Sequence, residues 1–145
     1  VLVGRKVGDS LWAVYASRDY VARHGKPSSI EEIQAHPVAG FEESMSGHRA
    51  SQWLRQVAPG ANIVARSGSV LGLLLSAKAG VGIAPLPTAL GDSEPELERV
   101  LGPIPALSRD WRLLAMPEIR KTARVSAFFD FIATEIDALK PIITG

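Results

Sequence analysis

The stretch from Arg66 to Pro87 has the sequence RSGSVLGLLLSAKAGVGIAPLP, and the rest of the chain is organised around it. Residues 67–69 have the turn and N-cap chemistry that begins a helix, and Gly80 is suited to end that helix. The run from Val70 to Ala79 is apolar on nearly every side, which predicts a helix covered on several faces. Residues 81–84 predict a buried strand, closed by the prolines that follow it. The stretch therefore predicts one strand–helix–strand unit at the centre of the fold.

The start of this predicted helix is also the best candidate for a binding surface. Ser67 and Ser69 place small hydroxyl groups there, next to N–H groups that no residue of the helix itself can satisfy. The free N–H groups and the positive end of the helix dipole favour an anionic or carbonyl group of a ligand. Plain helix capping explains the same two serines, and one hydroxyl can do both.

Composition describes an ordinary globular protein. The 145 residues are 46% hydrophobic and 21% charged, which is enough to bury a core and predicts one domain, bilobal at most. The 16 basic and 15 acidic residues give a net charge of +1 and form no long blocks, so a dedicated nucleic-acid face is not indicated. Arg49, Arg55 and Arg66 are accordingly interpreted as solvated side chains.

Cysteine content and hydropathy bear on location. The chain has no cysteine, so it has neither disulfides nor a thiolate metal site. No apolar run is long enough to span a bilayer, and no basic-then-apolar signal segment opens the chain. A cytoplasmic location is expected. The chain begins at Val1 without an initiating Met, and we expect an upstream part that was removed or lies elsewhere.

Strand and helix patterns alternate from Leu11 to Ala84, which predicts an α/β architecture. The continuous apolar run LWAVYA at residues 11–16 is typical of a strand buried on both faces and implies a parallel sheet. A Ser29–Glu32 capping box marks one of the helices. The expected strands are residues 11–16, 38–41, 62–66 and 81–84. The expected helices are residues 18–24, 30–35 and 70–79 and a further helix that ends at Val57. Ser17 is the expected cap of the first of these helices.

The last third of the chain differs in character. The segment from Gly91 to Glu98 is polar and acidic, and it precedes a predicted return strand at residues 111–115. A final helix is predicted from Thr122 to Leu139, with Pro141 as its stop. Its apolar side chains follow helical spacing: Val125, Phe128, Phe129, Ile132, Ile136 and Leu139.

Three segments, in order and spacing, resemble the effector-binding domain of LysR-type transcriptional regulators: LWAVYASRDYVARHGKP, SGSVLGLLLSAKAGVGIAPLP and WRLLAMPEIRKTARVSAFFDFI. The resemblance covers essentially the whole chain. It implies a periplasmic-binding-protein type II-like α/β fold, with two lobes joined by crossing strands behind an N-terminal winged helix-turn-helix. One departure is the Met116-Pro117 pair, because the return strand of these proteins usually ends in His-Pro.

The resemblance also implies a division of the chain. Residues 1–14 would end the first lobe and cross to the second, residues 15–112 would form the second lobe, and residues 113–145 would return to the first. The crossings would lie near residues 14–17 and 112–114. The chain would thus hold one complete lobe, the second along the chain, plus a returning strand and C-terminal helix of the other, truncated lobe, without most of that first lobe or the DNA-binding domain.

The cleft between the lobes would hold a small-molecule effector of unknown identity. On this lobe the resemblance implies a wall made by the loop from Phe41 to Ser46 and by the start of the central helix. Two carboxylates at a cleft edge would repel an acid, so either they face solvent or the ligand carries a donor or a cation. The implied effector-binding residues are Phe41, Glu42, Glu43, Ser44, Ser67, Ser69 and Val70.

Motifs that would indicate a catalytic or metal site are weak in this sequence. Gly8-Asp9-Ser10-Leu11 matches the four letters of the GDSL hydrolases, but the chain has no Asp-x-x-His, and a strand rather than a helix is predicted after Ser10. His24, His36 and His48 lie near helix ends or loops rather than with acids. No catalytic residue, metal or cofactor is therefore expected.

The leading hypothesis is a sensor that binds an effector and does no chemistry. Its other expected partners are a second copy of the chain, because the face from Val125 to Leu139 should lack part of its cover, and DNA through the missing N-terminal domain only; no membrane is expected. The alternatives are a solute-binding protein of a transporter and, third, an esterase.

Overall fold

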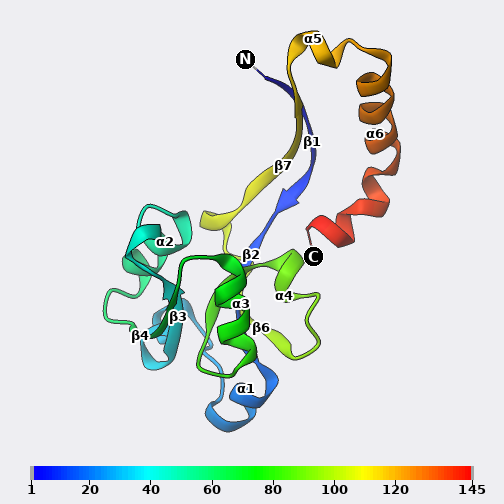
Figure 1. Cartoon of the computed structure of the whole chain (residues 1–145). Coiled ribbons are helices and arrows are strands. Elements are labelled where there is room, and N and C mark those ends of the chain that lie inside the picture. The colour runs from blue at the N-terminus through cyan, green and yellow to red at the C-terminus, as the bar shows by residue number, and fades with distance from the viewer. Residues whose placement is uncertain (1, 145) are drawn as a thin grey trace.

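The computed structural model describes residues 2–144, so Val1 and Gly145, the end residues of the two segments assigned above to the first lobe, lie outside the described residues. The chain forms a compact α/β part and an arm that extends from it (Figure 1). In the arm, β1 (Val3–Ser10) pairs antiparallel with β7 (Arg109–Ala115), and the long helix α6 (Ala123–Ile143) lies beside β1. The chain therefore leaves and enters the compact part through one antiparallel pair.

The other strands and helices lie between or after these elements. The remaining strands are β2 (Trp12–Ser17), β3 (Pro37–Phe41), β4 (Asn62–Ser67), β5 (Ala84–Pro87) and β6 (Leu97–Leu101). The remaining α-helices are α1 (Arg18–His24), α2 (Arg49–Val57), α3 (Val70–Lys78), α4 (Thr88–Gly91) and α5 (Pro117–Arg120). The 3-10 helices are η1 (Ile30–Ala35), η2 (Glu43–Met45) and η3 (Pro105–Leu107).

The sheet of the compact part is mixed. β2 lies between β5 and β6 and is antiparallel to both, which corrects the parallel sheet expected from residues 11–16. Among the described strands, β3 and β4 pair in parallel, and a parallel bridge from Val38 to Ile83 joins them to the rest, in the order β4-β3-β5-β2-β6. The continuous apolar run predicted a strand buried on both faces, and the structure confirms this because every residue of β2 is buried. Burial does not, however, specify the direction of the neighbouring strands.

The central helix begins and ends as predicted. Ser69 caps α3 by accepting a hydrogen bond from the Gly72 N–H, and Gly80 follows the helix at φ 78°, a conformation that favours glycine. Leu73 and Ala77 are fully buried against the sheet. Leu71 and Leu75 are 60% and 56% exposed, so the expectation that the helix is covered on several sides is wrong for this face.

The strand after α3 begins later than predicted. β5 spans Ala84–Pro87 rather than residues 81–84, and it includes both prolines that were expected to close it. Pro85 and Pro87 alternate along the strand, so their missing N–H groups point to one side, while Ala84 and Leu86 keep donors on the other. A proline pair two residues apart is therefore compatible with pairing to β2.

Three further expectations need correction. The segment 30–35 is a 3-10 helix whose predicted cap residue Ser29 makes no cap bond; instead Glu32 accepts from the backbone N–H and the hydroxyl of Ser28, both at 2.8 Å. Pro141 does not stop α6, which runs on to Ile143 because a proline near a helix end disturbs few hydrogen bonds. β6 and α4 lie within or beside a segment that the sequence predicted only as polar connection.

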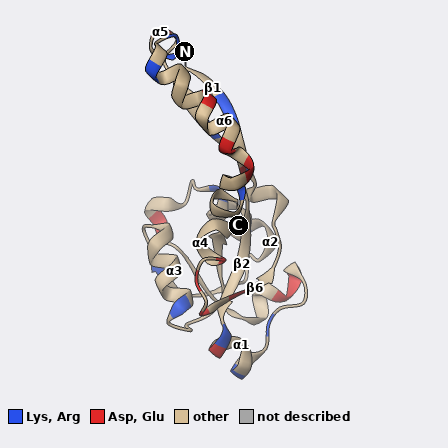
Figure 2. Cartoon of the chain, turned by 90° about the vertical axis from the view of Figure 1, so that its right-hand side faces the viewer, with Lys and Arg blue, Asp and Glu red and all other residues tan. Residues whose placement is uncertain are grey.

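The charged residues are dispersed over the structure, as the sequence predicted. Figure 2 shows basic and acidic residues interspersed over both the compact part and the arm of the described chain.

The expected crossings, residues 14–17 and 112–114, pair here with β6 and β1 respectively, and the division into two lobes stays a prediction. No helix within residues 2–144 is long and apolar enough to cross a membrane.

Candidate functional site

The carboxyl ends of β3 and β4 meet at one edge of the sheet. The connection from β3 leads outward to β4, and the connection from β4 leads back past β3 to Ile83, so right-handed crossovers place α2 and α3 on opposite faces. In α/β sheets, ligands bind at such a point, where connections leave the strand ends toward opposite faces. Phe41 pairs with Ser67 there, and the Glu42 N–H donates to the Ser67 carbonyl at 2.9 Å.

The first turn of α3 leaves two backbone N–H groups, those of Val70 and Leu71, available to a ligand. The Ser69 N–H donates to Ser67 Oγ at 3.2 Å, and the Gly72 N–H donates to Ser69 Oγ at 3.1 Å. The N–H groups of Val70 and Leu71 have no acceptor within the described part of the chain. Both predicted serines therefore cap the helix, and the donors left for a ligand belong to the backbone.

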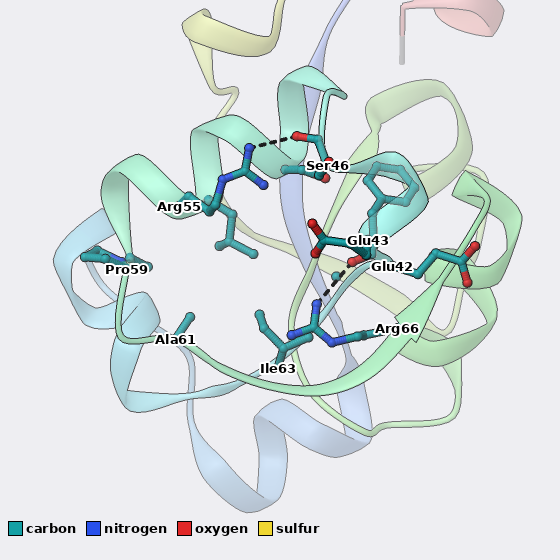
Figure 3. Close-up of a pocket in the computed structure, with 13 residues that line it drawn as sticks. Glu42, Glu43, Ser46, Arg55, Pro59, Ala61, Ile63 and Arg66 are labelled. Atoms are coloured by element: carbon teal, nitrogen blue, oxygen red, sulfur yellow. Dashed lines mark hydrogen bonds between the residues drawn. The ribbon is translucent and has the colours of Figure 1, made fainter.

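The two glutamates take different positions. Glu42 Oε1 accepts a hydrogen bond from Ser44 Oγ at 2.6 Å, and it lies beside the α3 start, where a Cβ on Gly68 would come within 2.8 Å of it. Figure 3 shows the Glu43 carboxylate on the inner side of a cavity next to α2, with the Glu42 side chain directed away from it. The Glu42 carboxylate thus adds an acceptor to the donors of α3, whereas the Glu43 carboxylate faces the cavity that both residues line.

The structure brings six of the seven predicted residues to one place. The loop after β3 and the start of α3 are joined by backbone and side-chain contacts, and Glu43 is the residue whose carboxylate turns elsewhere. The residues at the strand ends are Phe41, Glu42, Ser44, Ser67, Ser69 and Val70.

His48 is the N-cap of α2, at a helix end as the sequence predicted, but its place beside the candidate site was not predicted. Its Nδ1 accepts a hydrogen bond from the Ala50 N–H at 3.0 Å, so the neutral ring carries its proton on Nε2. The ring lies 4.8 Å from that of Phe41 and 5.5 Å from that of Trp12, measured between centroids. Burial, with a smaller effect from the charge of Arg49, lowers the His48 pKa below its usual 6.5. A histidine just before a predicted helix was the available signal.

Arg49 is not a simple solvated side chain, which corrects the interpretation from composition. Its Nη1 donates to the Leu107 carbonyl at 2.8 Å and so ties the first turn of α2 to η3, just before β7. Burial and then the charge of Arg109 lower its pKa. Arg49 therefore couples the helix beside the candidate site to the strand that leads into the arm.

The competing chemistries find no support in the geometry. Ser10 is the last residue of β1 and pairs with Arg109 of β7, so it does not lie on the strand-to-helix turn that a nucleophilic serine needs. His24 and His36 pack beside Tyr20, whose hydroxyl lies 2.6 Å from His36 Nδ1. Over residues 2–144, no three His, Asp or Glu side chains are grouped to hold a metal ion.

Comparison with known proteins agrees with this fold. The family model described as LysR substrate binding domain matches residues 1–137. The HTH-type transcriptional regulator CrgA of Neisseria meningitidis serogroup C (strain 8013) is 37% identical over 100 residues, which cover 64% of this chain and 31% of that protein.

Solved structures show the same architecture. A structure of CrgA from Neisseria meningitidis superposes with a TM-score of 0.70 at 25% identity and covers 93% of this chain and 48% of the other. The regulatory domain of AphB from Vibrio vulnificus superposes with a TM-score of 0.67 at 20% identity and covers 92% of this chain and 69% of that domain. The matched part of this chain thus spans about a third of the CrgA sequence and about half of the CrgA chain in the solved structure. With a mixed α/β sheet of the type II periplasmic-binding-protein-like kind and a family match over residues 1–137, the chain belongs to the LysR substrate-binding domain family.

Proposed function

We propose that this chain is the effector-sensing part of a LysR-type transcription regulator. In this proposal a small molecule binds at the strand ends, and a further domain of the whole protein binds DNA in the cytoplasm. The observation that carries the proposal is the joining of the Glu42 loop to the first turn of α3 at the point where the connections diverge. The family match supports it, since the family is one of substrate-binding domains.

The groups at the site define the chemistry of the effector. The free N–H groups of Val70 and Leu71 donate, and the Glu42 carboxylate accepts, within one small region. A simple anion would be attracted by the helix start but repelled by Glu42. The effector is therefore a small polar molecule that carries a carbonyl or carboxylate oxygen for α3 and a hydroxyl, amine or amide donor for Glu42.

Binding is passed on through the contact of α2 with η3. The candidate loop leads directly into α2, whose Arg49 donates to the Leu107 carbonyl next to β7. A ligand that favours one orientation of α2 would shift the population of arm orientations by the difference in its affinity for the two states. In the whole regulator, that shift would reach the DNA-binding subunits.

A thermal-shift screen of polar metabolites tests the site. Ser69→Trp places a bulky ring over the first turn of α3, and we expect it to abolish ligand-induced stabilisation while the protein stays folded. Ser93→Trp, in the exposed turn after α4, is the matched control and should keep the full shift. An unchanged shift in Ser69→Trp would remove this site from the proposal.

We also propose that the chain catalyses no reaction and that it is not a component of a transporter. Ser10→Ala should leave any ester hydrolysis by the preparation unchanged, whereas loss of activity in that variant would support an esterase. Sequencing the coding region upstream of Val1 separates the other alternative: a helix-turn-helix favours the regulator, and a secretion signal favours a solute-binding protein.

A further inference from the structure

A cavity lies between α2 and the edge strand β4, beside the candidate site, with which it shares Phe41 and Glu42. It has a volume of about 270 Å³, and Figure 3 shows the residues that line it. The volume is just below the range of about 300–1,000 Å³ typical of pockets for drug-sized ligands, which suits a small metabolite. α2 begins at the candidate site, but this cavity reaches down to the far end of the helix at Pro59.

One end of the cavity is apolar. Figure 3 shows Pro59 and Ala61 at this end, with Ile63 on β4 below. Leu54 of α2 and Ala58, which follows the helix, complete this lining, and both are buried. A ligand group that covers these side chains gains by removing apolar surface from water, at about 25 cal/mol per Å².

The other end carries charges of both signs. Arg55 Nη2 donates to the Ser46 carbonyl at 2.7 Å, and Arg66 Nη1 lies 3.4 Å from the Phe41 carbonyl, so each guanidinium is held by one backbone contact. In Figure 3 the Glu43 carboxylate lies between the two guanidinium groups. Within residues 2–144, neither arginine makes an ion pair with any carboxylate at 4.0 Å or less, and Glu43 makes none with any cation.

We propose that this cavity binds an aliphatic α-amino acid. A guanidinium has five donors in a planar fork, and with one of them used, Arg66 and Arg55 retain the geometry for a ligand carboxylate. The Glu43 carboxylate accepts from the ligand ammonium group. The aliphatic side chain lies over Leu54 and Ile63. A zwitterion with an apolar side chain matches this order of groups, whereas a simple carboxylate leaves Glu43 without a partner and a simple amine leaves the arginines without one.

Titration of the ¹⁵N-labelled chain with L-leucine tests the proposal. We expect saturable amide shifts at Gly40, Ala61 and Ile63, around the cavity. The analogues 4-methylpentanoate, which lacks the ammonium group, and 3-methylbutylamine, which lacks the carboxylate, should bind at least about tenfold more weakly, because each leaves one charged partner unmatched.

Two variants identify the groups involved. Arg66→Gln and Glu43→Gln should each weaken L-leucine binding by about tenfold or more; both side chains lie on exposed residues, so the fold should be retained. Arg23→Gln, on the far helix α1, is the control and should leave binding unchanged. The proposal is overturned if L-leucine gives no saturable shift, if both cavity variants bind as the unsubstituted chain does, or if the shifts are confined to residues 67–70, which would place the amino acid at the candidate effector site instead.

Discussion

The hydroxyl of Tyr15 donates a hydrogen bond to Asp92 Oδ1 at 2.5 Å, across 77 residues of sequence. Tyr15 lies in β2 and is 1% exposed, while Asp92 follows α4 and also contacts Arg99 of β6. The bond therefore connects three segments of the compact part. Burial, together with the bond to Asp92, raises the pKa of the Tyr15 hydroxyl, which keeps it a donor.

Tyr15→Phe tests this connection. Removing the hydroxyl takes one hydrogen bond from a charged acceptor, and we expect the free energy of unfolding to fall by about 1–2 kcal/mol. Ser93→Ala, one residue after Asp92 and on an exposed turn, should change it by less than about 0.5 kcal/mol. Urea unfolding measures both. Equal stability of the two variants would show that the Tyr15 bond contributes nothing net.

Gly72→Ala should destabilise α3 although alanine is the better helix former. A Cβ at position 72 would lie 1.8 Å from Ser67 Oγ and 2.6 Å from Ser67 Cβ, a clash that outweighs the gain of about 1 kcal/mol in helix propensity. Ser67→Gly removes both clashing atoms, so the double variant should recover stability relative to Gly72→Ala alone. A double-mutant cycle by thermal unfolding measures the coupling, and additive effects would contradict the contact.

Acidification should destabilise the chain partly through His48. Its folded-state pKa is lowered by burial, so it favours the neutral ring, and its contribution to stability is present above the unfolded pKa of about 6.5 and is lost as pH falls through the lower folded value. His48→Asn keeps a good N-cap but removes the titrating group. Melting curves from pH 7.5 to pH 5 should therefore fall less steeply for His48→Asn than for the unsubstituted chain. Identical slopes would exclude His48 as a source of the pH dependence.

The arm should mediate self-association of this chain. Phe128 and Phe131 of α6 are 51% and 59% exposed, and large apolar surfaces of this kind favour burial against a partner. We expect a concentration-dependent dimer or larger species in sedimentation velocity, and a shift toward monomer in the double variant Phe128→Ser, Phe131→Ser. Leu71→Ser, on the exposed face of α3, is the matched change on the compact part. A strictly monomeric chain at all concentrations would contradict this prediction.

Local signals in the sequence predicted most elements and the start of the central helix. Ser17, Ser69 and Gly80 act through hydrogen bonds or backbone angles within three or four residues, and the structure confirms each of them. The same holds for the alternation of strand and helix from Leu11 onward, and for the family, whose motifs lie in continuous segments.

Partner choice was decided only by the tertiary structure. The apolar run at residues 11–16 determined that β2 is buried on both faces, but its antiparallel pairing depends on where β5 and β6 arrive, and no local preference specifies that. Two neighbouring glutamates were likewise indistinguishable in the sequence. The fold places Glu42 beside the start of α3 and Glu43 between Arg55 and Arg66, because the turn of η2 sends adjacent side chains in different directions. Short-range chemistry thus determined most of the elements and the caps at Ser17 and Ser69, whereas contacts between residues distant in sequence decided which charges meet and where a ligand can bind.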